Sequence, residues 1–212
     1  MDGLTIVCIS DTHELHREID VPNGDILIHA GDFTMFSKSA AVIRDFNEWL
    51  GELPHRHKIV VPGNHEFFLE ADSTKRNLIS NADLLIDEAV EIMGLKIWGS
   101  PITSLYGGAF GRSSPKDRAL LYATIPDDVN ILVTHGPPYG VLDRSPGGLH
   151  HAGCPELREA VARLKPKLHL FGHIHGAHGI ENMGDTLFVN AALLGAEGSI
   201  EQSAIVLRVP QG

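Results

Sequence analysis

The chain has 212 residues, of which 17 are lysine or arginine and 27 are aspartate or glutamate, so its formal charge is −10. This acidic balance disfavours long nucleic acids and membranes as partners, because such polyanionic surfaces are bound through a surplus of basic residues. The length favours a single domain over residues 1–212. The acidic N-terminus and the shortness of the apolar runs predict neither a signal peptide nor a membrane span. With only two cysteines in the chain, we expect a cytoplasmic protein.

Five short apolar runs along the chain each end abruptly in Gly, Asp, Asn or His. The runs begin at Ile6, Ile26, Ile59, Ile131 and Leu168. Continuous apolar runs of this length, rich in β-branched residues, are typical of strands buried on both faces. Ligands of open α/β sheets bind beyond the carboxyl ends of such strands, so we expect the five polar ends to converge on one crevice.

Two segments between these strands have the spacing of amphipathic helices. Residues 37–53 carry apolar side chains at helical intervals, which predicts one buried stripe. Residues 155–165 begin with Pro155, which suits the first turn of a helix, and stop before Pro166, which cannot continue one.

A second group of strands is predicted outside the five runs. Apolar stretches at residues 90–92 and 95–98 flank a Met-Gly pair and predict a hairpin. We group this hairpin with strands at 187–189 and 204–207 in a second sheet. Two sheets with helices outside them predict an α/β protein, a four-layer αββα sandwich.

The residues at the strand ends are oxygen and imidazole donors. They are Asp11, His13, Asp32, Asn64, His65, His135, His173 and His175. No thiolate is among them, which disfavours a cysteine-type zinc site. A single histidine at a strand end is more often a hydrogen-bonded structural residue, but five strand ends of this kind are not independent accidents. The set exceeds the needs of one ion and suits two divalent ions about 3.5–4 Å apart that share a carboxylate.

The strings at these strand ends resemble those of the calcineurin-like metallophosphoesterases. They read Asp-Thr-His at 11–13, Gly-Asp at 31–32, Gly-Asn-His-Glu at 63–66, Thr-His-Gly at 134–136 and Gly-His-Ile-His at 172–175. Longer strings around Asp32, His135 and His173 are similar to the metallophosphoesterase-domain-containing branch, which is related to the class III cyclic nucleotide phosphodiesterases. The resemblance runs from about residue 4 to residue 191.

This resemblance implies two metal ions and assigns ligands to each. One ion would take Asp11, His13, Asp32 and His175, and the other Asp32, Asn64, His135 and His173. Asp32 would bridge the ions, and His65 would be the proton donor to the leaving group. A metal-bridging hydroxide would attack phosphorus in line. Nitrogen and oxygen ligands admit Mn, Fe, Zn, Co or Ni, with manganese as the first expectation.

The remaining histidines have weaker signals. His16, His55 and His57 lie in polar segments, which predicts solvated side chains. His29 and His169 lie inside predicted strands, as hydrogen-bonded core residues or as groups that orient a metal ligand. For a further set of loop residues, contact with substrate and simple solvation both stay open: His150, His151, His178, Arg112 and Arg118.

The sequence therefore indicates a dinuclear metal-dependent phosphodiesterase for small substrates. The five residues after Asp32 include no cation to bind the extra charge of a monoester, which favours diesters. The resemblance points to cyclic nucleotides, with 2′,3′-cyclic forms before 3′,5′-cyclic forms. Loop aromatics that could stack a base are Phe33, Phe36, Tyr106, Phe110 and Tyr139. A phosphomonoesterase and a metal- or nucleotide-binding scaffold without turnover stay open as alternatives, and no oligomeric state is indicated.

Overall fold

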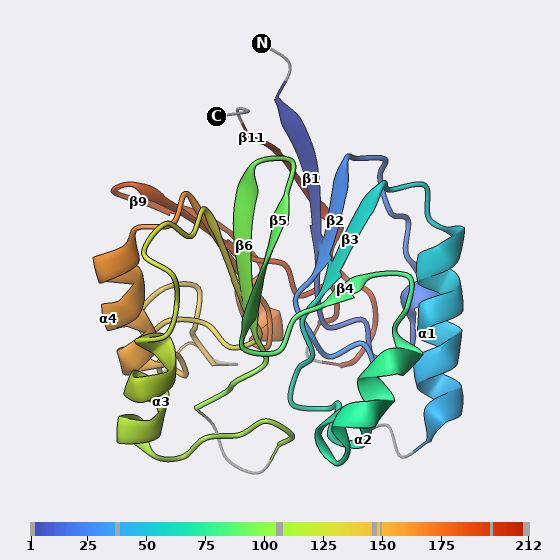
Figure 1. Ribbon diagram of the computed structural model, residues 1–212, viewed down its shortest axis with the longest axis horizontal. Helices are drawn as coiled ribbons and strands as arrows, with labels where there is room; N and C mark the ends of the chain where they lie inside the picture. Colours follow the sequence, from blue (N-terminus) through green and yellow to red (C-terminus); the bar gives the residue numbers. More distant parts are fainter. Residues whose placement is uncertain are drawn as a thin grey trace.

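The computed structural model describes residues 3–36, 39–104, 108–145, 148, 150–195 and 197–209. Within these residues the strands form two sheets that pack face to face, and helices cover both outer faces (Figure 1). The predicted α/β class and the four-layer αββα arrangement are thereby confirmed.

The first sheet has five strands among the described residues, in the order β11-β1-β2-β3-β4. Their bounds are β1 Leu4–Ile9, β2 Ile26–His29, β3 His57–Val60, β4 Asp83–Leu84 and β11 Ile205–Val209. β1 to β4 are parallel neighbours, and β11 pairs antiparallel with β1. The prediction that residues 204–207 join the second sheet is wrong, because a short apolar run does not specify its partner. Here β11 covers the edge that β1 would otherwise leave unpaired.

The second sheet has six strands in the described part of the chain, in the order β5-β6-β7-β8-β10-β9. Their bounds are β5 Glu88–Ile92, β6 Leu95–Ser100, β7 Ile131–Thr134, β8 Leu168–Phe171, β9 Gly179–Met183 and β10 Thr186–Asn190. The four central strands are parallel, with antiparallel β5 and β9 at the edges. The predicted β5–β6 hairpin is confirmed: Met93 and Gly94 have φ of 52° and 78°, as a two-residue turn of this kind requires.

Both predicted helices are present. The described helices are α1 Ala40–Glu52, α2 Phe67–Glu70, α3 Pro115–Tyr122 and α4 Pro155–Leu164, with 3₁₀ turns at His16–Glu18, Ser73–Leu78 and His175–Ala177. Residues 37 and 38 of the first predicted helix lie outside the described residues. The sequence analysis missed α3, whose local signal is Ser114, which accepts a hydrogen bond from the Asp117 amide as an N-cap, followed by Pro115.

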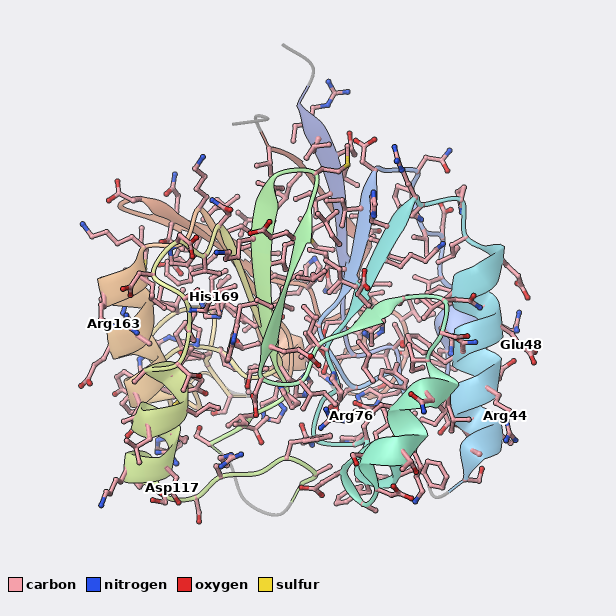
Figure 2. The ribbon with its side chains drawn as sticks, viewed as in Figure 1. Arg44, Glu48, Arg76, Asp117, Arg163 and His169 are labelled. Atoms are coloured by element: carbon pink, nitrogen blue, oxygen red, sulfur yellow. The ribbon has the colours of Figure 1, made fainter. Side chains whose placement is uncertain are left out.

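Three apolar clusters separate the four layers. Ile6 and Cys8 of β1 point between the two sheets, whereas Val7 and Ile9 point toward α1, as period-two alternation requires. A third cluster lies between the second sheet and the α3–α4 pair. Figure 2 shows Arg44 on the outer side of α1, away from these clusters. Cys8 is thus the small core residue that its apolar run indicates.

The two sheets are aligned so that the carboxyl ends of their parallel strands meet. Ser10, just after β1, forms a parallel bridge with Ala192, just after β10. The Leu193 amide also donates to the Ser10 carbonyl at 3.0 Å. In Figure 1 these ends lie at the lower side of the sheets, opposite the labelled termini. The fold therefore brings the five polar strand ends to one edge of the sandwich.

Candidate metal centre

The predicted site residues lie where the strand ends of the two sheets meet. The first sheet supplies Asp11 and His13 after β1, Asp32 after β2, and Asn64 and His65 after β3. The second sheet supplies His135 after β7 and His173 and His175 after β8. Asp11, His13, Asp32 and His135 are buried, and the other four are partly exposed. The structure brings all eight residues together, whereas their roles as ligands and acid stay predictions.

One group of donors consists of Asp11, His13 and His175, whose ligand atoms lie within 4.8 Å of one another. The Nε2 atoms of His13 and His175 face each other at 3.3 Å. His175 Nε2 also lies 3.4 Å from Asp11 Oδ1. Three donor atoms directed at one point are what a metal ion needs on one side of its coordination sphere.

A second group consists of Asp32, His135 and His173, also within 4.8 Å. His135 Nε2 lies 3.2 Å from Asp32 Oδ2 and 3.0 Å from Asn64 Oδ1. Asp32 Oδ2 is also 3.9 Å from His13 Nε2, which belongs to the first group. The Asp32 carboxylate therefore stands between the two groups, the position that a bridging ligand would take.

Backbone carbonyls orient three of the imidazole rings. His13 Nδ1 donates to the Thr34 carbonyl at 3.0 Å, His135 Nδ1 to the Ala30 carbonyl at 2.9 Å, and His175 Nδ1 to the Gly195 carbonyl at 3.3 Å. A carbonyl only accepts, so Nδ1 carries a proton in each ring and Nε2 is the nitrogen directed to the centre. This arrangement is typical of metal-binding histidines and fits the predicted ions.

The charges of the centre also fit a cation. Among the described residues, Asp11 and Asp32 form ion pairs with histidines alone. Burial alone would raise the pKa of Asp11, but its hydrogen bond with His175 and the charge of His135 lower it. Burial would lower the pKa of His135, but the Asp32 carboxylate raises it to about 10. Two buried carboxylates thus require positive charge nearby, which a proton on His135 provides here and divalent ions would provide when bound.

Four of the predicted ligands have left-handed backbone, which side chains other than glycine rarely adopt. The φ angles are 54° for Asp11, 40° for His13, 55° for Asp32 and 68° for His173. Backbone hydrogen bonds hold these turns: the Asp11 amide donates to the Gly31 carbonyl at 2.9 Å, and the His13 amide to the Asp32 carbonyl at 3.0 Å. Strain of this kind persists where the surrounding structure aims side chains at a functional site.

Three motif glycines are required by close approach. A Cβ atom on Gly31 would lie 2.4 Å from His135 Nδ1, one on Gly63 would lie 2.2 Å from Asp32 Oδ1, and one on Gly172 would lie 2.1 Å from Asp11 Oδ2. Any side chain at these positions would displace a predicted ligand. Each glycine directly precedes a predicted ligand in its motif. The motif thus supplies one donor residue and, at the glycine, the space that a ligand from another strand end occupies.

Glu66 is a positioning residue that the sequence analysis quoted within a motif but gave no role. Its buried carboxylate accepts the backbone N–H of Asp32, Thr34 and Gly63. Burial and the nearby Asp32 charge raise the pKa of Glu66 to about 8. Glu66 thereby joins the loop after β2 to the loop after β3. Its place immediately after Asn64 and His65 was the available signal.

His29 and His169 are hydrogen-bonded core residues, as one of the two expectations for them states. His29 Nδ1 accepts the Gly31 amide, so its Nε2 donates to Thr12 Oγ1 at 3.0 Å. In the second sheet, Thr134 Oγ1 donates to a backbone carbonyl and accepts from His169 Nε2 at 2.9 Å. Each threonine precedes a predicted ligand histidine in the chain. In both sheets a threonine–histidine hydrogen bond therefore holds the residue next to a predicted ligand in place.

Two sequence predictions about solvated side chains are wrong, and one open alternative is excluded. His16 is 1 % exposed because it packs on Phe46 and Trp49 and bonds Asp45 at 2.9 Å. His55 is 2 % exposed and donates to a backbone carbonyl. Arg118, for which substrate contact and solvation were both open, is not a solvated loop charge, because it is buried on α3 and pairs with Glu156. In each case a partner far along the chain makes burial favourable.

Other residues without an assigned role have ordinary surface or structural positions. Arg112 is exposed and lies 4.0 Å from Asp87, and His57 is partly exposed at the start of β3. His178 donates to the Ala192 carbonyl, and His150 is exposed. The described helices include none long and apolar enough to cross a membrane.

Comparisons with known proteins agree with this site. The profile described as calcineurin-like phosphoesterase matches residues 4–177. A UPF0046 protein of Caenorhabditis elegans is 38 % identical over 223 residues, covering 98 % of this chain and 76 % of that protein. Human metallophosphoesterase domain-containing protein 1 is 39 % identical over 231 residues, covering 96 % of this chain and 70 % of that protein.

A solved structure shares the fold at low identity. The crystal structure of TT1561 from Thermus thermophilus superposes with a TM-score of 0.61 at 16 % identity, covering 89 % of this chain and 88 % of that one. At this identity the likeness concerns the fold, which agrees with the two-sheet sandwich described above.

Proposed function

The chain belongs to the calcineurin-like phosphoesterase family, and from this premise we propose that it is a phosphodiesterase for small substrates, with cyclic nucleotides as first candidates. The coarser statement needs no proposal: the protein is a metal-dependent phosphoester hydrolase of a family that binds a dinuclear metal centre. The preference for diesters, the substrate and the roles of single residues are the proposal.

We assign the two ions to the two donor groups, with manganese as the first candidate. One ion takes Asp11, His13, Asp32 and His175, and the other takes Asp32, Asn64, His135 and His173. When bound, such a pair supplies Lewis acidity toward the phosphoryl oxygens and activates water. The chain itself holds Asp32 between the groups and directs the Nε2 atoms to the centre through the carbonyls behind the rings.

His65 is proposed as the proton donor to the leaving oxygen. It lies on the cavity wall, with Nε2 3.8 Å from Asp32 Oδ2. Its buried Nδ1 has no hydrogen-bond partner among the described residues. The ring is therefore not tethered to a backbone carbonyl as the three oriented rings are. Burial lowers the pKa of His65 and the Asp32 charge opposes this shift, so the ring can exchange a proton at the cavity wall. Proton donation of this kind is typically worth ~10²–10⁴-fold.

The lining of the cavity carries the preference for diesters. Its polar residues are the predicted ligands and His65, and its apolar residues are Met35 and Phe36, which are 44 % and 55 % exposed. No lysine or arginine is among the described residues that line it. A monoester dianion carries one more charge than a diester and is usually bound by an added cation, often arginine.

Phe36 supports a substrate with a flat organic group. Its ring stacks on the His65 ring with centroids 4.1 Å apart and an interplanar angle of 26°. A nucleobase or aryl ring beside the scissile phosphate would meet this aromatic surface. Of the other aromatics considered, Phe33 is a core residue, Phe110 packs at the edge of a core cluster, and Tyr106 lies outside the described residues.

The partners and location follow the same reasoning. A net charge of −10 does not favour binding of long nucleic acids or anionic membranes, so a small phosphodiester remains the proposed substrate. A cytoplasmic location stays a prediction.

The test compares diesters with a monoester. With purified protein and a series of divalent metals, bis-p-nitrophenyl phosphate and 2′,3′-cyclic AMP should be hydrolysed with higher kcat/KM than p-nitrophenyl phosphate. A monoester that is the better substrate across metals and pH would favour the phosphomonoesterase instead. Absence of hydrolysis with bound metal would favour the scaffold.

A further inference from the structure

A buried aspartate outside the metal centre holds a histidine at the surface. Asp143 is 1 % exposed, and its Oδ2 accepts the backbone N–H of Gly140 at 2.9 Å and of Gly153 at 3.0 Å. Its Oδ1 lies 2.6 Å from His151 Nδ1. Neither residue belongs to the predicted metal groups. The His151 ring is nevertheless oriented by a hydrogen bond to a buried acceptor, as three of the predicted ligand histidines are.

The geometry fixes which edge of the His151 ring faces outward. A carboxylate that already accepts two backbone N–H groups also accepts from His151, so Nδ1 of that ring carries the proton. Nε2 is left without this partner, and the side chain is 30 % exposed. The Tyr139 ring, 47 % exposed, lies 5.1 Å from the His151 ring. An aromatic face and an imidazole nitrogen are thus presented side by side.

The segment that carries this pair lies near the metal centre. Ala152, next to His151, lies around one closely packed crevice with Gly136, Pro137, Cys154 and His173, a predicted ligand. His173 also lines the cavity that contains His65 and Phe36. His173 is the one lining residue common to both, so the segment next to His151 lies close to a predicted ligand of the site where phosphate would be bound.

The loop that carries the pair is also tied to the centre. The Asn190 side-chain amide donates to the Leu142 carbonyl, next to Asp143, at 3.2 Å. The same nitrogen donates at 3.0 Å to the carbonyl of Ile174, which lies between His173 and His175. The distance between this loop and the predicted ligands is therefore set by a shared, buried hydrogen-bond donor.

We propose that Tyr139 and His151 form a nucleoside subsite: the base packs on the Tyr139 ring, and the ribose 5′-hydroxyl donates to His151 Nε2. This inference rests on the proposed function, because it places the organic part of the substrate relative to the scissile phosphate. Asp143 is a positioning residue, since it keeps the proton of His151 on Nδ1 and so keeps Nε2 an acceptor.

The test uses adenosine 3′-monophosphate, whose 5′-hydroxyl is free as in the cyclic substrate, as a competitive inhibitor of bis-p-nitrophenyl phosphate hydrolysis, together with KM for 2′,3′-cyclic AMP. His151→Asn retains a donor where Nδ1 stands and removes the outward nitrogen. The quantity compared is the ratio of the nucleotide Ki to the KM for bis-p-nitrophenyl phosphate, which has no sugar. His151→Asn should raise this ratio about threefold to tenfold, because one hydrogen bond is lost. Tyr139→Leu should raise the same ratio by a similar factor.

The control is His150→Asn, at the exposed neighbouring position, which should leave the ratio at its wild-type value. An equal change for nucleotide and aryl substrate in His151→Asn would mean that His151 only orders the loop, and would overturn the subsite. So would an unchanged ratio, or a wild-type protein that adenosine 3′-monophosphate does not inhibit.

The subsite and the proposed function fail separately. If 2′,3′-cyclic AMP is not hydrolysed but the nucleotide inhibits with a Ki that depends on His151, the subsite stands and the cyclic substrate is wrong. If 2′,3′-cyclic AMP is hydrolysed and neither variant moves Ki or KM, the proposed function stands and the subsite is wrong.

Discussion

Single residues at the centre are placed by their hydrogen-bond partners rather than by their own conformational preference. Asp11, His13 and Asp32 adopt left-handed backbone, and the carbonyls behind His135 and His175 determine which nitrogen faces inward. Such positioning costs local strain, which the surrounding structure must outweigh. The roles of individual side chains can therefore be separated by substitutions that change one contact at a time.

His65→Ala should discriminate between leaving groups. Hydrolysis of 2′,3′-cyclic AMP, which expels a poor alkoxide, should fall ~10²–10⁴-fold, the usual contribution of a proton donor. Hydrolysis of bis-p-nitrophenyl phosphate should fall much less, because p-nitrophenolate leaves without a proton. Steady-state kinetics on both substrates and metal analysis make the measurement.

The control is His57→Ala, at the opposite end of β3 from the centre. This control variant should change neither the rates of hydrolysis of the two substrates nor the metal content. An equal loss on both substrates in His65→Ala, or loss of metal, would identify His65 as a ligand or a structural residue instead.

His169→Gln should flatten the dependence of stability on pH. Burial lowers the pKa of His169 to about 3 from an ordinary value of 6.5. The unfolded chain therefore takes up a proton below pH 6.5 that the folded chain excludes, so this contribution to stability is complete above pH 6.5 and is lost as pH falls toward 3. Between pH 7 and pH 5 it amounts to about 2 kcal/mol.

Gln keeps a donor for Thr134 but does not titrate. Denaturant unfolding of metal-free protein at pH 7 and pH 5 should show a free-energy difference smaller by about 2 kcal/mol in the variant than in the wild type. Identical differences in the two proteins would show that His169 is not a buried neutral histidine.

At the scale of elements, the centre is built where strands of different sheets come into contact. The segment after β8 packs against the segment after β1, since the His173 amide donates to both Asp11 carboxylate oxygens at 3.1 and 3.0 Å. Gly172 makes this approach possible, because a Cβ atom there would lie 1.9 Å from Ser10 Oγ. The contact between the segment after β1 and the segment after β8 therefore depends on the absence of a side chain at Gly172.

Gly172→Ala should reduce metal affinity ~10–100-fold, as loss of a group that orients a ligand does, and should destabilise the fold by about 1–3 kcal/mol through overpacking. Gly176→Ala is the matched control, because no atom lies within 4 Å of a Cβ there. Titration with Mn²⁺ and thermal unfolding measure both effects. Equal behaviour of the two variants would contradict the close-contact explanation.

At the scale of the whole molecule, the predicted ions would join the two sheets. Asp11, Asp32 and Asn64 come from the first sheet, and His135 and His173 from the second. Ions bound to ligands from both halves stabilise the folded state alone, because the unfolded chain does not hold these residues together. Metal binding should thus be visible in global stability as well as in activity.

Removing the metals with a chelator should lower Tm by roughly 11–22 °C, the effect of about 5.4 kcal/mol expected for two ions, each at ~100 times its Kd, in a chain of this length. Asp32→Ala should abolish activity and most of this Tm difference, because the shared ligand is lost. The control is Asp185→Ala, at an exposed position, which should retain both the activity and the Tm difference. Metal analysis should find two ions per chain; one ion at saturation with full activity would defeat the dinuclear assignment.

The sequence by itself determined the strand-end pattern, the two long helices, the β5–β6 hairpin and the grouping of eight donor residues. These features depend on local signals: apolar runs, helical spacing, prolines at helix ends and a Met-Gly turn. Parallel strands then place their carboxyl ends at one edge whatever the loops between them contain. This explains why the candidate site could be proposed before any distance was known.

The tertiary structure alone decided features that depend on partners far apart in the chain. β11 pairs with β1 rather than with the second sheet, and His16 is buried because Asp45 and two aromatic rings of α1 surround it. Glu66 joins two loops, and Asp143 orients His151 beside Tyr139. A residue type does not specify its long-range partner, because burial and hydrogen bonding are set by whichever segments the packed sheets bring into contact.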